Sequence, residues 1–317
     1  MAQIGIALSS EERTATELVE AAARAEQAGF HAGWISDHFH PWNDEQGQSP
    51  FVWAVLGGIA SVTSSMGWVT AVTCPTVRTH PAIIAHAAAT VATLMPGRFR
   101  LGLGSGEALN ERVLGDDWPY AEERLAMLEE AVEIIRLLWE GGVQSHEGAY
   151  YLLQHARLYS LPDAPPEILV SGFGPEAIEV AARIGDGFIT TKPNADDIAA
   201  YRGHGGRGPT QGGLKVCYGP DADECLQTVH RLWPNSGLPG ELAQILPTPA
   251  HFEQASELVT PEMLQDSFAC GPDPEVHAAA IQTYVDAGFD EVFVGHVGPG
   301  HDAFLDFYRR EVLPRFQ

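Results

Sequence analysis

The feature that most constrains the fold is an alternation of short apolar runs with stretches of helical periodicity along almost the whole chain. The apolar runs predict strands at 4–7, 32–35, 66–74, 99–103, 168–171, 187–191, 215–218 and 291–297. The periodic stretches predict helices at 16–28, 50–63, 81–95, 122–139, 175–184, 195–201, 223–233, 274–287 and 302–312. Such alternation implies a parallel sheet, and roughly eight β-α units suit either a closed (β/α)8 barrel or a doubly wound open sheet.

Three segments depart from this alternation. The stretch 143–160 predicts a hairpin insertion, because two strand-like arms flank a turn at Glu147-Gly148. The stretch 203–213 contains six glycines and one proline, and we predict a mobile surface loop there rather than a ligand lid. The stretch 234–266 is irregular and rich in proline, so we interpret it as an insertion within a single barrel domain spanning 1–317.

The composition excludes several classes of partner. A formal net charge of -24 disfavours nucleic acid and anionic membranes, since both require clustered Lys and Arg. No apolar run reaches the roughly 18 residues that would span a bilayer, and the N-terminus lacks the basic and apolar blocks of a secretory signal, so we expect a cytoplasmic protein. The four cysteines are scattered without a Cys-x-x-Cys pair, which fits a reducing compartment and argues against a structural zinc site.

The positions of polar and small residues favour the barrel over the open sheet. The stretch 102–106 follows a predicted strand, but its G-x-G-x-G spacing and the lack of an acidic strand end about 20 residues later make it a weak dinucleotide fingerprint. In a barrel, reactive residues gather at the C-terminal ends of several strands. Segments of this kind directly follow five predicted strands, at 37–38, 74–76, 104–107, 171–174 and 190–192.

The stretch after the second predicted strand carries the densest group of candidate functional side chains. His38 can act as a general base near neutral pH, and Asp37 can either orient it or bind a ligand. A histidine after a strand is as readily an ordinary hydrogen-bonded loop residue. His31, His38 and His40 lack a carboxylate or further histidine at a supportive spacing, so we predict no metal site.

Two glycine-containing turns and one tryptophan complete the candidates. Glu107 is either an acid held close to a ligand by flanking glycines or a first-turn carboxylate that complements a helix dipole. The turn Gly172-Phe173-Gly174 precedes a proline-started helix and can present free N–H groups to an anion, although an ordinary tight turn explains it equally well. Trp42 can line a pocket for a planar ligand, although such aromatics more often pack a core.

Together these motifs resemble the luciferase-like monooxygenase superfamily, and within it the glucose-6-phosphate-dehydrogenase-type branch that uses the deazaflavin coenzyme F420. The matching segments occur in the same order along nearly the whole chain: Ser36-Asp37-His38-Phe39-His40-Pro41-Trp42, Pro75-Thr76 before Pro81-Ala82-Ile83-Ile84-Ala85, Gly104-Ser105-Gly106-Glu107-Ala108-Leu109-Asn110-Glu111, Gly185-Asp186-Gly187-Phe188-Ile189 and Gly298-Pro299-Gly300-His301-Asp302. The resemblance implies a luciferase-like α/β fold, a (β/α)8 TIM barrel with insertions, and a homodimer.

The resemblance also implies roles for individual residues. His38 is expected to be the base that takes the substrate hydroxyl proton, Trp42 to stabilise the charged intermediate, and Glu107 to protonate the reduced ring. The residues expected to hold the cofactor are Asp37, Ala71, Val72, Gly106, Asn110, Gly172, Phe173 and Gly174. A non-prolyl cis peptide is expected between Ala71 and Val72. The residues expected near the substrate are His40, Thr191 and Lys192.

The sequence departs from the sugar-phosphate enzymes in the phosphate clamp. Those enzymes use two lysines and an arginine, whereas this chain has Gln254 and Asp266 where two of the cations are expected, and Lys192 lies near the third. Because Asp266 would repel a phosphate dianion, glucose 6-phosphate is not expected as the substrate.

The resemblance therefore implies an F420-dependent oxidoreductase that transfers a hydride between the deazaflavin and a small-molecule alcohol, hemiacetal or carbonyl substrate. One alternative is a monooxygenase of the same superfamily that depends on flavin mononucleotide (FMN). A second is a non-catalytic deazaflavin-binding protein, against which intact His38 and Glu107 argue.

Overall fold

Eight parallel strands form a closed barrel in the computed structural model, which describes residues 2–316. In order around the barrel they are β1 (Gln3–Leu8), β2 (Ala32–Ile35), β3 (Gly67–Thr70), β4 (Phe99–Leu103), β7 (Ile168–Ser171), β8 (Gly187–Thr190), β9 (Thr210–Cys217) and β11 (Glu291–His296). Strands β8 and β9 close the sheet, with Phe188 opposite Thr210. The predicted barrel is confirmed, and the open sheet is excluded.

Side chains fill the barrel interior. The rings of Trp34 and Phe293 stack with their centroids 4.5 Å apart. Val69, Leu169 and Ile189 pack around this pair, and Ala71 and Val72 pack against the same cluster. The barrel is therefore a solid core, and chemistry is confined to its ends.

The prediction of a surface loop at 203–213 is wrong for its last four residues, because the chain from Thr210 onwards belongs to β9. A Cβ at Gly213 would lie 2.2 Å from the ring of Trp34 inside the barrel, and a Cβ at Gly212 would lie 2.5 Å from Tyr284 outside it. Glycine is therefore required at these positions because rings on both faces of the strand leave no room for a side chain, and the glycines do not mark a loop.

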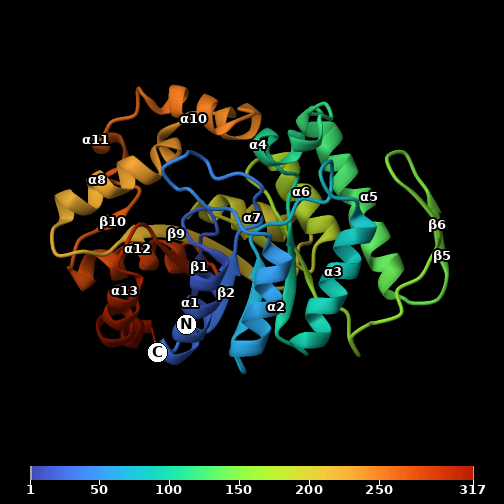
Figure 1. The fold of residues 1–317 in the computed structure, drawn as a ribbon, viewed down its shortest axis with the longest axis horizontal. Helices are drawn as coiled ribbons and strands as arrows, with labels where there is room; N and C mark the ends of the chain where they lie inside the picture. Colours follow the sequence, from blue (N-terminus) through green and yellow to red (C-terminus); the bar gives the residue numbers. More distant parts are fainter. Residues whose placement is uncertain (1, 317) are drawn as a thin grey trace.

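Helices surround the barrel, as Figure 1 shows. Those outside the insertions are α1 (Ala15–Ala28), α2 (Val52–Val62), α3 (Pro81–Leu94), α5 (Ala121–Trp139), α6 (Pro175–Ile184), α7 (Ala195–Gly203), α8 (Ala222–Leu232), α12 (Pro274–Asp286) and α13 (His301–Phe307), besides the short α4 described below. Several begin with side-chain caps: Thr14 and Glu17 form a capping box at α1, and Asp221 accepts two backbone N–H groups at α8. After α13 the chain continues as a π-helical turn, η3 (Tyr308–Val312), and a 3-10 turn, η4 (Leu313–Phe316).

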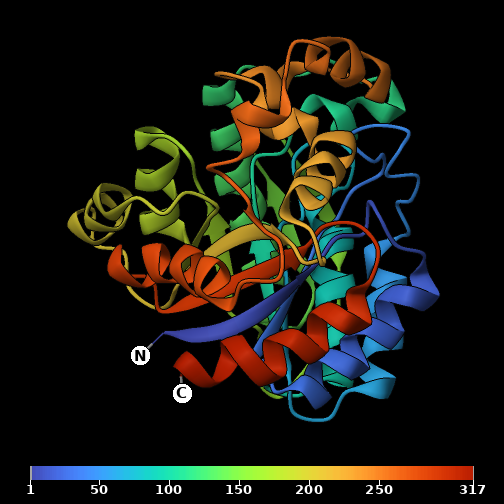
Figure 2. The ribbon, with the colours of Figure 1, turned by 90° about the vertical axis from the view of Figure 1, so that its left-hand side faces the viewer.

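The two segments predicted as insertions stand outside the barrel. The stretch 143–160 contains the antiparallel pair β5 (Gln144–Glu147) and β6 (Leu152–Ala156). The stretch 234–266 contains η2 (Pro234–Gly237), α9 (Leu242–Ile245), α10 (Pro249–Ser256) and α11 (Pro261–Leu264), and β10 (Ala269–Cys270) then pairs with β9. Figures 1 and 2 place the helices of 234–266 at the end of the barrel away from the chain termini.

Within residues 2–316, no helix has both the length and the apolar character needed to cross a bilayer.

Candidate active site

His38 lies just beyond the C-terminal end of β2 and is held between two carboxylates. Its Nδ1 lies 2.9 Å from Oε1 of Glu11, and its Nε2 lies 3.8 Å from Oε1 of Glu107. Glu11 follows β1 and Glu107 follows β4, so three separate strands deliver these groups. The Glu11 side chain is 2% exposed and the Glu107 side chain 22% exposed, so Nε2 is on the more open side of the ring.

The charge of Glu11 sets the protonation state of His38. Burial lowers the pKa of His38, but the carboxylate of Glu11, aided by Glu107 and Asp37, outweighs burial and raises this pKa to about 9. Burial likewise raises the pKa of Glu11, but the charge of His38 and the hydroxyl of Ser9 outweigh it and hold that pKa at about 2. At neutral pH the pair is therefore an imidazolium beside a carboxylate.

Glu11 is a functional candidate that the sequence interpretation missed. Hydroxyl groups of Ser9 and Ser36 donate to its Oε2 at 2.5 and 3.0 Å, so the carboxylate is fixed on the His38 side. In the sequence it reads as one of several acids before the first helix. It also follows a strand, and the rule that barrel strand ends carry the chemistry was the signal that could have identified it.

Aromatic rings close one side of His38. The Trp42 ring meets the His38 ring edge to face at a centroid distance of 5.2 Å, and Phe252 of α10 meets Trp42 similarly at 5.0 Å. Asn43 and Gln46 both donate to the carbonyl of Leu232, at 3.0 and 2.9 Å. The loop that carries Trp42 is thereby fastened to the end of α8 and lies under the insertion 234–266.

Asn110, expected at the cofactor, is engaged by the protein itself. It lies in α4 (Ala108–Glu111), and its Oδ1 accepts the backbone N–H groups of Phe39 and His40 at 2.7 and 2.8 Å. Its Nδ2 donates to Glu107 at 2.5 Å. Asn110 therefore holds Glu107 and the loop after β2 in one arrangement.

Asp37 belongs to a buried charge network beside His38. Its carboxylate accepts from Thr73 Oγ1 at 2.8 Å and from Arg78 Nη2 at 3.1 Å. Arg78 also lies 3.4 Å from Glu111, whose pKa burial raises to about 7 despite this cation. Arg78 was missed in the sequence because it stands in the loop before α3, several residues beyond the strand end.

The peptide bond between Ala71 and Val72 is cis, as the resemblance implied. These two residues lie on top of the interior cluster and are partly exposed, so they form a floor at the barrel mouth. A Cβ at Gly104 would lie 2.6 Å from Val72, and a Cβ at Gly106 would lie 2.5 Å from Cys74 Sγ. The glycines after β4 are therefore required for packing against the β3 loop, in addition to any approach to a ligand.

The turn Gly172-Phe173-Gly174 and Lys192 come together at one edge of this floor. Gly174 is the N-cap of α6, and no side chain caps that helix end. The Lys192 ammonium lies 5.9 Å from the centroid of the Phe173 ring. Exposed N–H groups and an ammonium on the same edge suit an anionic group.

The remaining predicted residues do not form a group with His38. Thr191 is exposed, and its carbonyl accepts from Tyr284 at 2.8 Å. His40 has its Nδ1 3.1 Å from the carbonyl of Leu109, while His31 precedes β2 and therefore lies at the opposite end of the barrel. Among residues 2–316, no three His, Cys, Asp or Glu side chains are arranged to hold a metal ion.

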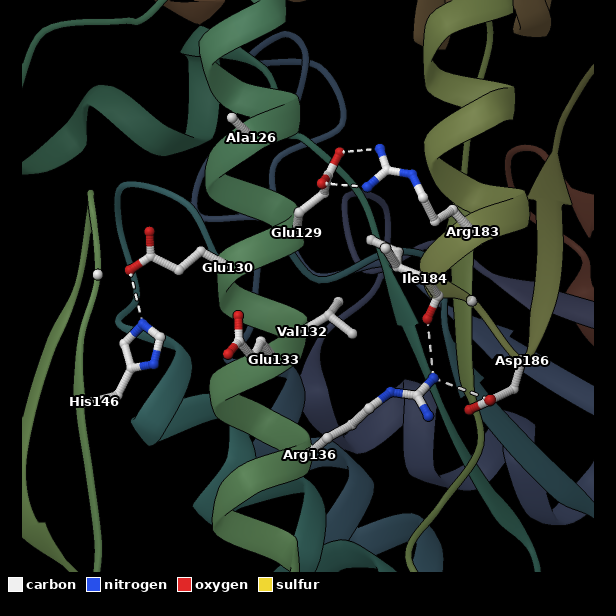
Figure 3. A pocket seen from close by; sticks show the side chains of 12 residues that line it. Ala126, Glu129, Glu130, Val132, Glu133, Arg136, His146, Arg183, Ile184 and Asp186 are labelled. Carbon is white, nitrogen blue, oxygen red and sulfur yellow. Dashed lines mark hydrogen bonds and ion pairs between the residues drawn. The ribbon is translucent and has the colours of Figure 1, made fainter. Parts of the chain in front are cut away.

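A surface cavity of about 720 Å³ lies elsewhere, between α5, α6 and the β5–β6 hairpin (Figure 3). Its charged groups pair within the walls, as Arg183 does with Glu129 at 2.5 Å and Arg136 with Asp186 at 3.0 Å. None of the candidate residues lines it. The mouth of the barrel is therefore the candidate active site.

Known proteins resemble this chain along nearly its whole length. The model of the luciferase-like monooxygenase family matches residues 1–291. The F420-dependent glucose-6-phosphate dehydrogenase of Beutenbergia cavernae is 34% identical, over 100% of this chain and 98% of that protein. The F420-dependent hydroxymycolic acid dehydrogenase of Mycobacterium tuberculosis is 38% identical, over 99% and 88%. A solved F420-dependent secondary alcohol dehydrogenase, bound to an F420-acetone adduct, superposes with a TM-score of 0.92 at 28% identity and covers 98% of each chain.

Proposed function

Since the chain belongs to the luciferase-like monooxygenase family, we propose that it is an oxidoreductase that uses coenzyme F420 to interconvert an alcohol or hemiacetal and a carbonyl compound. The observation that carries the proposal is His38 at the barrel mouth, charged by Glu11 on one side and open toward Glu107 on the other. Relatives that align with nearly the whole chain are named as F420-dependent dehydrogenases, which supports the choice of cofactor.

The residues present fit a deazaflavin with an anionic tail. The floor at Ala71 and Val72 offers an apolar surface for a planar ring, and the start of α6 with Lys192 offers N–H groups and a cation for a phosphate. When bound, the deazaflavin accepts or donates the hydride. We thus assign Lys192 to the cofactor side of the site. Asp37 holds the loop that contains Ala71 and Val72 in place through its bonds to Thr73 and Arg78.

The protein's own contribution is proton transfer. His38 exchanges a proton with the substrate oxygen through Nε2, while Glu11 holds Nδ1 and fixes the orientation of the ring. Because the pKa of His38 is about 9, the residue is ready at neutral pH to donate to a carbonyl oxygen, and it accepts from a hydroxyl only at higher pH. Trp42 packs its ring against His38 and excludes water from that side.

An unphosphorylated substrate fits this mouth better than a sugar phosphate. Gln254 and Asp266, which stand where phosphate-binding cations are expected, are both exposed on the insertion. Neither supplies the bidentate or cationic contacts that a phosphate dianion requires. We therefore place the substrate among alcohols, hemiacetals or carbonyls without a phosphate.

Cofactor choice is testable by titration of the protein's tryptophan fluorescence. Oxidised F420 should bind at least about tenfold more tightly than FMN, which corresponds to about 1.4 kcal/mol. Lys192→Gln should weaken F420 binding severalfold, because it removes one charge-assisted contact. The matched control is Arg207→Gln, an exposed cation outside the mouth. Strong binding of FMN without binding of F420 would instead support the FMN-dependent monooxygenase.

We also propose a homodimer formed through α2 and α3, which lie side by side (Figure 1). Neither helix contains a charged residue, yet Ile83 is 60% exposed and Leu94 52% exposed, and Val62 is also exposed. An uncharged face with exposed aliphatic residues is typical of an interface.

The dimer proposal predicts a change of mass in solution. Light scattering should give twice the chain mass for the natural protein, and Ile83→Glu should give monomers, because a charge would be buried at the interface. Leu258→Glu is the matched control, since Leu258 is 84% exposed on the insertion. A monomeric natural protein, or loss of the dimer with Leu258→Glu alone, contradicts this interface.

The cysteines support a cytoplasmic location. Cys217, Cys225 and Cys270 are free thiols clustered around β9 and β10. Cysteines without disulfide pairing suit a reducing compartment.

A further inference from the structure

Lys215 is one of only two lysines in the chain, and it points into the barrel near its C-terminal end. Side chains alternate along β9, and two residues fix the inward face. Gln211 accepts from Trp34 Nε1 at 2.8 Å inside the barrel, and Gly213 abuts the same ring. Lys215 is the next inward residue, and it lies opposite Gly295 of β11, which lies opposite Ala7 of β1.

The ammonium of Lys215 has an aromatic ring but no carboxylate as its partner. Its Nζ lies 4.1 Å from the centroid of the Trp233 ring. No carboxylate oxygen of residues 2–316 forms an ion pair with it within 4.0 Å. Burial lowers the pKa of Lys215, while Glu11 and Glu12 act in the opposite direction. Both acids are already engaged: Glu11 by His38, and Glu12 by Trp233 Nε1 and the backbone N–H of Gly298, each at 2.7 Å.

Lys215 and Trp42 are connected through Trp233 and its hydrophobic cluster. Trp233 directly follows Leu232, whose carbonyl holds the loop that carries Trp42. Trp42 packs against the same cluster that contains Trp233. Partial burial of a cation without an anionic partner costs free energy, and an anionic ligand beside the ammonium would offset this cost.

We infer that Lys215 contacts the substrate and selects one that carries a carboxylate, a step that rests on the proposed function. A single ammonium against the Trp233 ring matches a monoanion with an apolar body. A phosphate dianion would call for several cations or a bidentate arginine. The substrate class is therefore a hydroxy or oxo carboxylic acid, with its reacting oxygen toward His38 and its carboxylate toward Lys215.

The test compares carboxylates with their uncharged amides in direct binding. Hexanoate, mandelate and 3-hydroxybutyrate, and the primary amide of each, are titrated against the F420-loaded protein by calorimetry. At least one acid should bind about tenfold or more tightly than its amide, the amount expected from one charge-assisted contact. Lys215→Met should remove this preference and leave amide binding unchanged, and Lys215→Arg should retain part of it.

Two results would overturn the inference: no acid binds more tightly than its amide, or Lys215→Met weakens acid and amide equally. Arg112→Met, at an exposed cation, is the control for net charge. Titration of F420 in the same variants separates this inference from the proposed function. Failure to bind F420 contradicts the function, whereas an unchanged F420 affinity with no acid preference contradicts only the assignment of Lys215.

Discussion

Replacing His38 with alanine is expected to lower kcat/KM by about 100-fold to 10,000-fold in either direction of hydride transfer, the range that positioned acid-base catalysts supply. The Nε2 atom of His38 faces the barrel mouth on the side of Glu107, and no other histidine lies at that position. F420 affinity should change little, because the proposed cofactor contacts are at the Ala71-Val72 floor and the α6 turn. Steady-state rates and a fluorescence titration on the same preparation measure both quantities.

His31→Ala is the matched control for this experiment. His31 is exposed and precedes β2, so it lies at the end of the barrel opposite His38. Its replacement should leave both rate and cofactor affinity near those of the natural protein. A His38→Ala variant that retains turnover contradicts the assignment of His38, and one that loses F420 binding instead assigns His38 to the cofactor.

Replacing Glu11 with glutamine is expected to produce the second large effect, a shift in the pH dependence. The Glu11 carboxylate raises the pKa of His38 to about 9, so removing its charge should move that pKa toward neutrality. Carbonyl reduction needs protonated His38, and its rate should fall as pH rises through about 9 in the natural protein. Alcohol oxidation needs neutral His38 and should rise through the same range. In Glu11→Gln, the fall in the rate of carbonyl reduction and the rise in the rate of alcohol oxidation (the two pH limbs) should both move to lower pH.

The neighbouring Glu12→Gln variant controls for charge without touching His38, because Glu12 bonds to Trp233 and Gly298. Its pH limbs should stay close to those of the natural protein. pH limbs that move equally in both variants would show a general effect of net charge. pH limbs that move in neither variant would contradict the claim that Glu11 raises the pKa of His38.

Much of the fold was accessible from the sequence because each barrel unit repeats a local pattern. Strand β4 and helix α6 have the bounds that periodicity predicts. The segment 203–213 is an exception. Its glycines predict a flexible loop, whereas the structure has Gly213 in a strand, where the ring of Trp34 occupies the space that a side chain would need. Crowding from a residue far away in the chain cannot be deduced from local composition.

The site was accessible only in part. Strand ends identified His38 and Glu107, and the structure brings them within 3.8 Å of each other. Glu11 was missed because an acid before a helix has an ordinary explanation in capping. Asn110 is expected at the cofactor, and its bonds to Glu107 and to the loop after β2 could not be predicted, because the sequence does not position those loops. The sequence places Lys215 in a predicted strand. It does not show that the side chain points into the barrel, because that direction depends on the register of the barrel strands.

The most direct test of the central claim follows the redox state of F420 during turnover. Oxidised F420 and the protein are mixed without oxygen with a panel of secondary alcohols, hydroxy acids and unphosphorylated sugars, and bleaching is compared with the appearance of the carbonyl product. The account predicts bleaching with equimolar carbonyl formation for at least one compound, and its loss in His38→Ala. Consumption of the panel only with reduced FMN and oxygen, with F420 unchanged throughout, would contradict it.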